Sequence, residues 1–204
     1  MKRFIIEASK IVSSLFNPFY LPVLGMVVLF VFSYLSMLSW PYKLQVLITV
    51  LFFTVMLPTF AIDWYRRFKG WTEAEMAKKE HRVIPYTISI ISYVICYYIM
   101  TVMRIPRFMC NIVLAALVLQ MVCGIINLWW KVSTHSAASG GLTGALVAFS
   151  MIFGFNPFWW LCLVILLSGL VGTSRMILRQ HTLWQIFAGY AIGFVVACGV
   201  LLFC

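Results

Sequence analysis

Seven long stretches without a charged residue or a histidine constrain the fold of this chain more than any other feature. Each is close to the length of about 20 residues that an α-helix needs to cross the ~30 Å hydrocarbon core of a bilayer. A helix also satisfies its own backbone hydrogen bonds, which lipid cannot do. The sequence therefore predicts an all-α fold, a polytopic transmembrane helical bundle. The predicted spans are residues 18–38, 44–62, 83–103, 108–130, 136–155, 157–174 and 182–204.

Two features leave the number of spans between six and seven. Pro22 interrupts the first stretch, and the turn at 154–157 is short, although it is sufficient for a helical hairpin. Upstream of the first span, apolar residues within 4–16 recur at helical spacing with charges on the other side. This pattern predicts an N-terminal interfacial helix that ends before Pro18.

Small residues recur at four-residue spacing in the fifth span, at Gly140, Gly144 and Ala148. Such a surface allows another helix to approach closely. We interpret it as a helix-packing surface.

The composition agrees with a membrane location and excludes other classes of protein. Hydrophobic residues make up 64% of the chain and charged residues 10%, against roughly a quarter charged in soluble domains. The net charge of +10 does not indicate a nucleic-acid partner, because the cations lie in short loops beside apolar stretches, where they set topology. The six cysteines lie within apolar stretches without CxxC spacing, so we expect neither disulfides nor metal ligands among them.

Three polar clusters interrupt the apolar pattern, and each contains one of the three histidines. They are residues 78–82 (KKEHR), 131–136 (KVSTHS) and 174–185 (SRMILRQHTLWQ). Two transmembrane hairpins separate them, so all three are predicted to meet at one membrane face. The cations Lys43, Arg104 and Arg107 are predicted for the opposite face. By the positive-inside rule, the clusters would face the cytoplasm, with the protein in a bacterial inner membrane.

The clusters combine cations and histidines with few acids to neutralise them, so they are expected to bind an anion. Arg82 and Arg175 offer planar forks that match phosphate oxygens, Lys131 offers a point charge and Ser133 a hydroxyl donor. With a phosphate ester, one neutral histidine can attack phosphorus while another protonates the leaving oxygen.

Neither a metal nor another cofactor is expected at such a site. No HExxH sequence occurs, and the cations would repel a metal ion. They would also stabilise the transferring phosphoryl group themselves.

The spacing in the third cluster resembles a motif of the type-2 phosphatidic acid phosphatases, relatives of the vanadium haloperoxidases. Their motif SRxxxxxHxxxD is similar to Ser174-Arg175, five residues, His181, three residues and Gln185. Only the final acid is replaced, by glutamine.

The other two motifs of that family are less completely kept. Their PSGH resembles residues 132–135, matching at Ser133 and His135. Their KxxxxxxRP corresponds to Arg82, with a proline three residues later, and Lys79 or its neighbour Lys78 can take the place of the lysine. The resemblance covers residues 78–204, a phosphatase-like core of one membrane domain at 1–204. Residues 1–77 add nothing specific.

The resemblance implies a role for each matched residue. His181 would be the nucleophile and His135 the general acid, with Arg82, Ser133 and Arg175 as phosphate ligands. We add Lys131 from its chemistry alone. Gln185 would orient His181 with a neutral carbonyl, at a cost of roughly 1 kcal/mol, about fivefold to tenfold in rate. Equally, Gln185 fits a capping box with Thr182, and the sequence does not choose between the two interpretations.

The sequence thus predicts a metal-independent hydrolase that cleaves a lipid phosphomonoester or diphosphate through a phosphohistidine. Candidate substrates are phosphatidate, phosphatidylglycerol phosphate, polyprenyl diphosphate and lipid A phosphate. The alternative, favoured by Gln185 and the altered first motif, is a non-catalytic binder or carrier of a lipid phosphate or anion. A haloperoxidase-like use of vanadate is disfavoured by the apolar surroundings. The specific lipid, the leaflet and the oligomeric state are left open.

Overall fold

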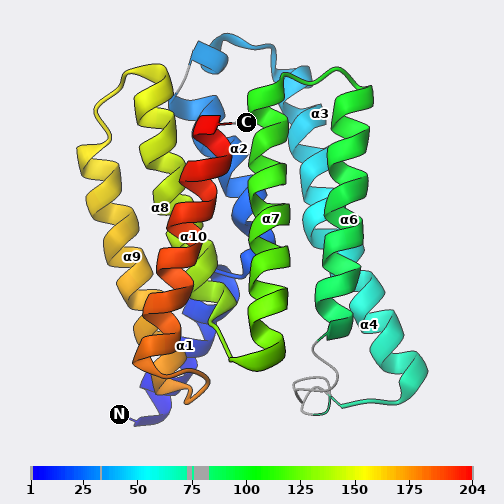
Figure 1. Cartoon of the computed structure of the whole chain (residues 1–204), viewed down its shortest axis with the longest axis vertical. Coiled ribbons are helices and arrows are strands. Elements are labelled where there is room, and N and C mark those ends of the chain that lie inside the picture. The colour runs from blue at the N-terminus through cyan, green and yellow to red at the C-terminus, as the bar shows by residue number, and fades with distance from the viewer. Residues whose placement is uncertain (1, 33, 73–74, 76–82, 204) are drawn as a thin grey trace.

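The computed structural model describes residues 2–32, 34–72, 75 and 83–203, and all regular structure within these ranges is helical. Figure 1 shows the long helices side by side along the long axis of the molecule. In chain order they are α1 (Lys2–Leu15), η1 (Pro18–Tyr20), α2 (Leu21–Phe32), η2 (Tyr34–Met37), α3 (Trp40–Leu51), η3 (Phe52–Met56), α4 (Leu57–Lys69), α6 (Val83–Val102), α7 (Arg107–Trp129), α8 (Thr134–Phe153), α9 (Phe158–Ile177) and α10 (Leu183–Phe203).

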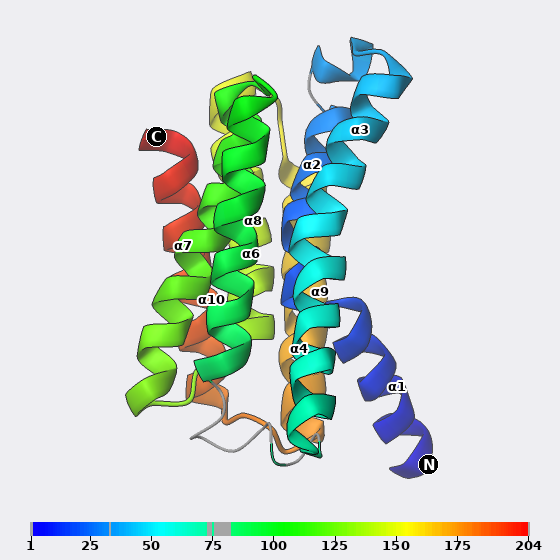
Figure 2. The same ribbon diagram turned by 90° about the vertical axis from the view of Figure 1, so that its right-hand side faces the viewer.

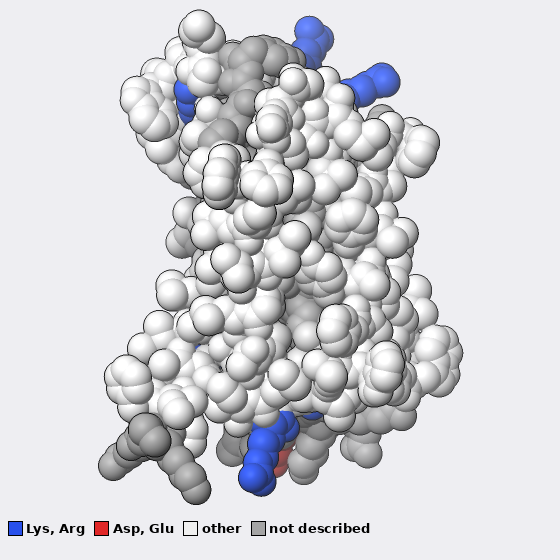
Figure 3. Space-filling model, turned by 90° about the vertical axis from the view of Figure 1, so that its left-hand side faces the viewer, with Lys and Arg blue, Asp and Glu red and all other residues white. Residues whose placement is uncertain are grey.

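The described ranges contain seven helical stretches that are long and apolar enough to cross a membrane. This confirms the all-α membrane fold and the higher of the two expected span counts. Figure 3 shows cations at the two ends of the molecule and a broad uncharged band between them. The molecule therefore has the surface expected of an integral membrane protein.

The N-terminal helix α1 ends before Pro18 as predicted, but it runs on into the first span with only a short break. The Asn17 side chain accepts a hydrogen bond from the Phe19 N–H at 3.2 Å and starts the 3₁₀ turn η1, from which α2 continues. The first candidate span is therefore Phe4–Val31, displaced towards the N-terminus from the predicted 18–38. In Figure 2, α1 leans away from the bundle at its N-terminal end. Its interfacial location stays a prediction.

The second span, Trp40–Lys69, is longer than predicted and contains a π-helical turn. Pro58 lacks an N–H, so the helix widens just before it. In the widened turn, the Phe53 carbonyl accepts a hydrogen bond from the Ser92 hydroxyl of α6. The irregular turn thus attaches this span to α6.

Helices α8 and α10 are in close backbone contact because glycines line their interface. A methyl group added to Gly193 would lie 1.9 Å from the Ala137 carbonyl oxygen. One added to Gly140 would lie 2.0 Å from the carbonyl oxygen of Tyr190. Only glycine lets the backbones approach this closely, so the packing interpretation of the small-residue repeat is confirmed.

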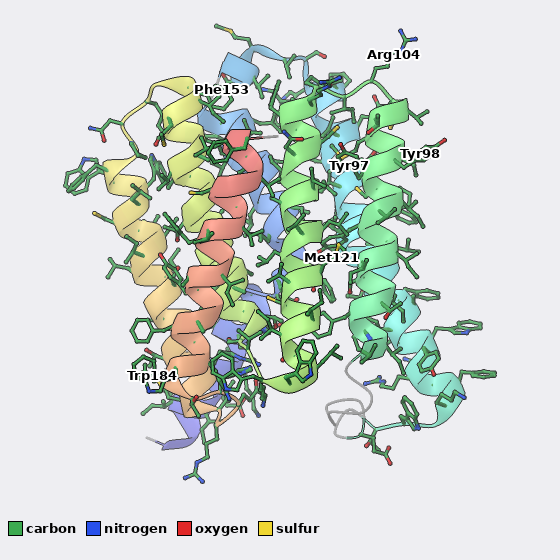
Figure 4. The ribbon with its side chains drawn as sticks, viewed as in Figure 1. Tyr97, Tyr98, Arg104, Met121, Phe153 and Trp184 are labelled. Carbon is green, nitrogen blue, oxygen red and sulfur yellow. The ribbon has the colours of Figure 1, made fainter. Side chains whose placement is uncertain are left out.

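The largest cluster of buried apolar side chains lies in the half of the bundle away from the histidines. Met26, Val50, Met100, Val113 and Phe149 belong to it. Figure 4 shows Arg104 and Trp184 at opposite ends of the molecule, with Trp184 at the end where α10 begins. This cluster therefore stabilises the half of the bundle away from the site, while a smaller apolar cluster that includes Val132 and Ala137 lies nearer the site.

Candidate active site

A cavity of about 430 Å³ opens at the end of the bundle that carries the predicted clusters. The loop after α7 and the loop after α9 meet there, since Lys131 Nζ donates a hydrogen bond to the Gln180 carbonyl at 2.6 Å. The cavity is lined by Pro18, Phe19, Pro85, Tyr86, Ser89, Gln120, Asn127, Lys131, Val132, Thr134, Arg175, Gln180 and His181. The prediction that clusters 131–136 and 174–185 share one face is confirmed.

The remaining cluster, 78–82, lies outside the described residues, and with it the predicted phosphate ligands Lys79 and Arg82. The start of α6, which follows directly, does reach the cavity through Pro85 and Tyr86. The roles of Lys79 and Arg82 stay predictions.

His181 lies in the loop before α10 and faces Gln185 in the first turn of that helix. Gln185 Oε1 is 3.3 Å from His181 Nδ1, and it also accepts a hydrogen bond from the Thr182 N–H at 3.2 Å. A carbonyl oxygen has two lone pairs, so the capping and the orienting interpretations are compatible. The same oxygen caps the helix and contacts the histidine.

The loop that presents His181 takes its shape from the end of α9. The Gln180 N–H bonds to the Arg175 carbonyl at 3.0 Å and the Arg179 N–H to the Met176 carbonyl at 2.9 Å, the two bonds of a Schellman motif. Arg179 has φ 53°, in the left-handed region that favours glycine. This reversal returns the chain so that Gln180 and His181 line the cavity.

Arg175, in the last turn of α9, lines the cavity and also contacts the N-terminal helix. Its Nη1 donates a hydrogen bond to Ser13 Oγ at 2.7 Å. Its Nε is buried and has no hydrogen-bond partner among the residues that the structure describes. We did not predict the contact with Ser13. Its only sequence signal was a pair of serines, Ser9 and Ser13, one turn apart on the polar side of an amphipathic helix.

Ser133, predicted as a phosphate ligand, is fully buried as the N-cap of α8. Its Oγ accepts hydrogen bonds from the Ser136 N–H at 3.3 Å and the Ser136 hydroxyl at 2.9 Å. This geometry gives Ser133 a capping role. Its role as a ligand stays a prediction.

His135, the predicted general acid, lines a narrower cavity of about 20 Å³ next to Phe16 and Asn17. Its Nδ1 is buried and lacks a hydrogen-bond partner within the described part of the chain. Arg175 and His181 lie close enough for their charges to act on the His135 ring. The structure thus places the two histidines in one neighbourhood but in different cavities, and the role of His135 stays a prediction.

Asn127 and Tyr86 form a wall of the large cavity that sequence reasoning missed. Asn127 Nδ2 donates to Tyr86 Oη at 2.9 Å, and Asn127 Oδ1 accepts from the Val132 N–H at 3.2 Å. These bonds connect α6, α7 and the loop before α8. An amide inside an otherwise apolar span was the available signal.

The same two residues, Tyr86 and Asn127, line a second space, an apolar groove of about 200 Å³ between α6 and α7. Its other lining residues are Val83, Thr87, Ile90, Met121, Gly124, Ile125 and Leu128. The Tyr86–Asn127 hydrogen bond therefore stands between a polar cavity and an apolar groove.

By its chemistry, the large cavity suits an anion. It presents Arg175 and Lys131 as cations and His181 as a nucleophile or hydrogen-bond donor. Across the described ranges, no three His, Cys, Asp or Glu side chains gather in an arrangement that could hold a metal ion.

Residues 124–204 match the model of the PAP2 superfamily. Over these residues, the chain is similar to the PAP2 superfamily. The match includes α8, α9 and α10 with His135, Arg175 and His181, and it confirms the resemblance to the type-2 phosphatidic acid phosphatases. The match indicates a phosphatase-type hydrolase that acts on phosphate esters.

The PAP2 match leaves residues 1–123 uncovered, including α1 and the altered first motif. No curated protein and no solved structure matches the chain. The division into an N-terminal part at 1–77 and a phosphatase-like core at 78–204 stays a prediction.

Proposed function

We propose that the protein is a membrane-embedded phosphatase that hydrolyses a lipid phosphate or diphosphate through a phosphohistidine intermediate. One observation carries the proposal: Lys131, Arg175 and His181 line a single cavity, and all three lie in the part that matches the PAP2 superfamily. The proposal needs no metal, because cationic side chains can stabilise the charge on a transferring phosphoryl group.

In the first step, His181 attacks the phosphorus atom. With its proton on Nδ1, facing the Gln185 carbonyl, the ring has the Nε2 lone pair available as nucleophile. The Nε2–phosphorus bond forms while the bond from phosphorus to the leaving oxygen breaks. Arg175 and Lys131 stabilise the charge on the non-bridging oxygens, and Arg82, Ser133 and Lys79 are the further proposed phosphate ligands.

His135 is the proposed proton donor to the leaving oxygen, since Arg175 and His181 lie close enough for their charges to act on its ring. In the second step, a water molecule attacks the phosphohistidine and gives a proton to His135. The phosphorus–nitrogen bond breaks, phosphate leaves, and both histidines return to their starting states.

A lipid substrate is supported by the surroundings of the cavity. The groove shares Tyr86 and Asn127 with the cavity, and its residues Met121 and Ile125 are 44% and 53% exposed on the outside of the bundle. Figure 4 shows Met121 on the part of α7 next to α6. A phosphate head in the cavity is therefore compatible with an acyl or prenyl chain in the groove.

The test is phosphate release by the purified protein from a panel of phosphatidate, phosphatidylglycerol phosphate, polyprenyl diphosphate and lipid A phosphate. We expect His181→Ala to abolish turnover, with a loss on the order of 10³-fold or more. Arg175→Ala is expected to lower it by about 10²-fold to 10³-fold. Arg104→Ala, an exposed cation at the opposite end, is the control and retains wild-type turnover. Equal turnover by wild type and His181→Ala would refute the proposal.

A non-catalytic binder or carrier of lipid phosphates is the second candidate, and the neutral Gln185 favours it. A glutamine oxygen gives less stabilisation than a carboxylate to the imidazolium that forms during catalysis. This candidate predicts saturable binding of phospholipid without turnover and tolerance of His181→Asn. A phosphohistidine trapped by quenching without acid would exclude it.

A further inference from the structure

Helix α1 lies outside the PAP2 match, yet it contacts a residue of the site. Arg175 Nη1 donates its 2.7 Å hydrogen bond to Ser13, which lies 162 positions earlier in the sequence. We infer that Ser13 is a positioning residue, which holds the Arg175 guanidinium so that its remaining donors face the phosphate. The kinetic part of this inference rests on the proposed function.

The packing of α1 places its serines against the protein. Ser9 and Ser13 are 4% and 8% exposed, whereas Phe4 is 78% and Leu15 65% exposed. This is the reverse of an amphipathic helix in a soluble domain, because lipid rather than water surrounds the apolar side in a membrane. Small serine side chains also permit a close approach to α9. Ser13 is therefore held at the site by the docking of the whole helix.

The hydrogen bond to Ser13 leaves part of the Arg175 fork unused. A guanidinium presents donors on more than one edge, and a phosphate commonly takes two of them together. Ser13 occupies Nη1, while Nε is buried without a partner among the described residues. A buried donor without an acceptor is unfavourable, and an anion that accepts from it removes that penalty. Ser13 would therefore hold the Arg175 side chain in an orientation in which a bound anion can accept a hydrogen bond from Nε.

The residues that follow Ser13 form walls of both cavities. Phe16 and Asn17 line the narrow cavity that contains His135. Pro18 and Phe19, in the next turn, line the large cavity. A displacement of α1 would thus disturb the orientation of Arg175 and the space around His135 together.

The experiment compares the full-length wild type with Ser13→Ala, Ser13→Thr and Ser14→Ala, using lipid phosphate turnover and inhibition by orthovanadate, a phosphate mimic. Ser13→Ala removes a hydrogen bond to a charged group, so we expect kcat/KM to fall about tenfold and vanadate inhibition to weaken similarly. Ser13→Thr keeps the hydroxyl and should stay within about twofold of the wild type. Ser14 is the exposed neighbour on the same helix, and its alanine variant should match the wild type.

Three results would overturn the inference. Unchanged kinetics of Ser13→Ala would show that the hydroxyl is irrelevant, and faster turnover would show that Ser13 competes with the phosphate for Arg175. A Ser13→Thr variant as impaired as Ser13→Ala would indicate packing instead of hydrogen bonding.

A wild-type protein without turnover on any lipid would refute the proposed function but not this inference. In that case, the inference is tested by calorimetry, which measures the affinity of the wild type and of Ser13→Ala for orthovanadate. Weaker binding by the variant supports the role of Ser13. Equal affinities, or no binding to the wild type, reject it.

Discussion

Two helix pairs in this protein meet in different ways. Helices α8 and α10 contact each other backbone to backbone through glycines, with added bonds from Tyr190 Oη to Thr143 Oγ1 at 3.1 Å and from Cys198 Sγ to the Gly144 carbonyl at 3.1 Å. Between α6 and α7, the Tyr86 ring packs on Gly124 and a groove of about 200 Å³ remains.

The difference corresponds to two tasks. Both α8 and α10 begin at the site end, so the positive ends of their dipoles point towards the cavity, and a histidine lies at or just before each helix start. A close, rigid contact holds these helix starts in a fixed relation. The looser α6–α7 pair leaves space for an apolar chain. Under the proposed function, the tightly packed pair would position the catalytic groups, and the open pair would accommodate the lipid chain of the substrate.

The largest expected effect comes from breaking the tight pair with Gly193→Ala. The added methyl group would lie 1.9 Å from the Ala137 carbonyl oxygen and 2.8 Å from the Gly141 nitrogen, both backbone atoms that cannot turn aside. We expect a loss of about 3 kcal/mol of stability, seen as a lower Tm and loss of monodispersity in detergent.

The matched control for that change is Gly199→Ala on the same helix, where an added methyl group meets nothing within 4 Å. It should stabilise α10 slightly, by about 0.5–1 kcal/mol, because alanine favours the helix more than glycine does. If both variants melt at the same temperature, close approach of α8 and α10 is not required.

A smaller effect is expected from filling the groove of the loose pair with Gly124→Leu. Each methylene excluded from an apolar site is worth ~0.8 kcal/mol, so displacing about two gives roughly tenfold lower kcat/KM on a long-chain lipid phosphate. Turnover of a short-chain or water-soluble phosphate monoester should change little. Gly169→Leu, at an exposed position of α9 with nothing within 4 Å, is the control. An equal loss of kcat/KM on both substrates would show that the lipid chain does not bind in this groove.

The Gln185→Glu variant tests whether a charged side chain at the start of α10 stabilises His181 during catalysis. The new carboxylate keeps an oxygen for the Thr182 N–H and adds a charge beside His181 Nδ1. A charge-assisted bond in place of a neutral one should raise kcat about fivefold to tenfold at unchanged Tm. An unchanged kcat would mean that Gln185 acts only as a helix cap.

The smallest effect is expected from changing the two arginines at Schellman motifs to glycine. Arg104 follows α6 of the loose pair, and Arg179 lies in the loop before α10 of the tight pair. Both arginines adopt the left-handed conformation, with φ 55° and 53°. Arg104→Gly and Arg179→Gly should each stabilise the protein by about 1 kcal/mol, a rise in Tm of about 2–4 °C. If only one variant gains stability, the other arginine side chain has a stabilising contact of its own.

Sequence reasoning succeeded where the information is local. The helical spans follow from runs of apolar residues, and the end of α1 follows from Asn17-Pro18. The shared face of Lys131 and His181 follows from counting hairpins. The first candidate span begins at Phe4 instead of residue 18, because only a short 3₁₀ turn separates α1 from α2. The capping of α8 by the Ser133 hydroxyl was not predicted, and the role of Ser133 as a phosphate ligand stays a prediction.

Gln185 shows why two local interpretations could not be separated in advance. Its spacing from His181 and from Thr182 fitted an orienting carbonyl and a capping box equally well. The fold places one oxygen within reach of both groups. No sequence motif marks the groove residues or the Tyr86–Asn127 hydrogen bond. The groove and the bond form only when α6 and α7 pack at a particular separation.

The sequence by itself determined the helical membrane architecture and the spacing of the arginine and histidines, because helix length and motif spacing depend on residues close together in the chain. The tertiary structure decided which faces meet: Ser13 of α1 against Arg175, and Gly189 and Gly193 of α10 against α8. Such contacts join segments tens to more than a hundred residues apart. They depend on how side-chain sizes fit across helices, which no local pattern specifies.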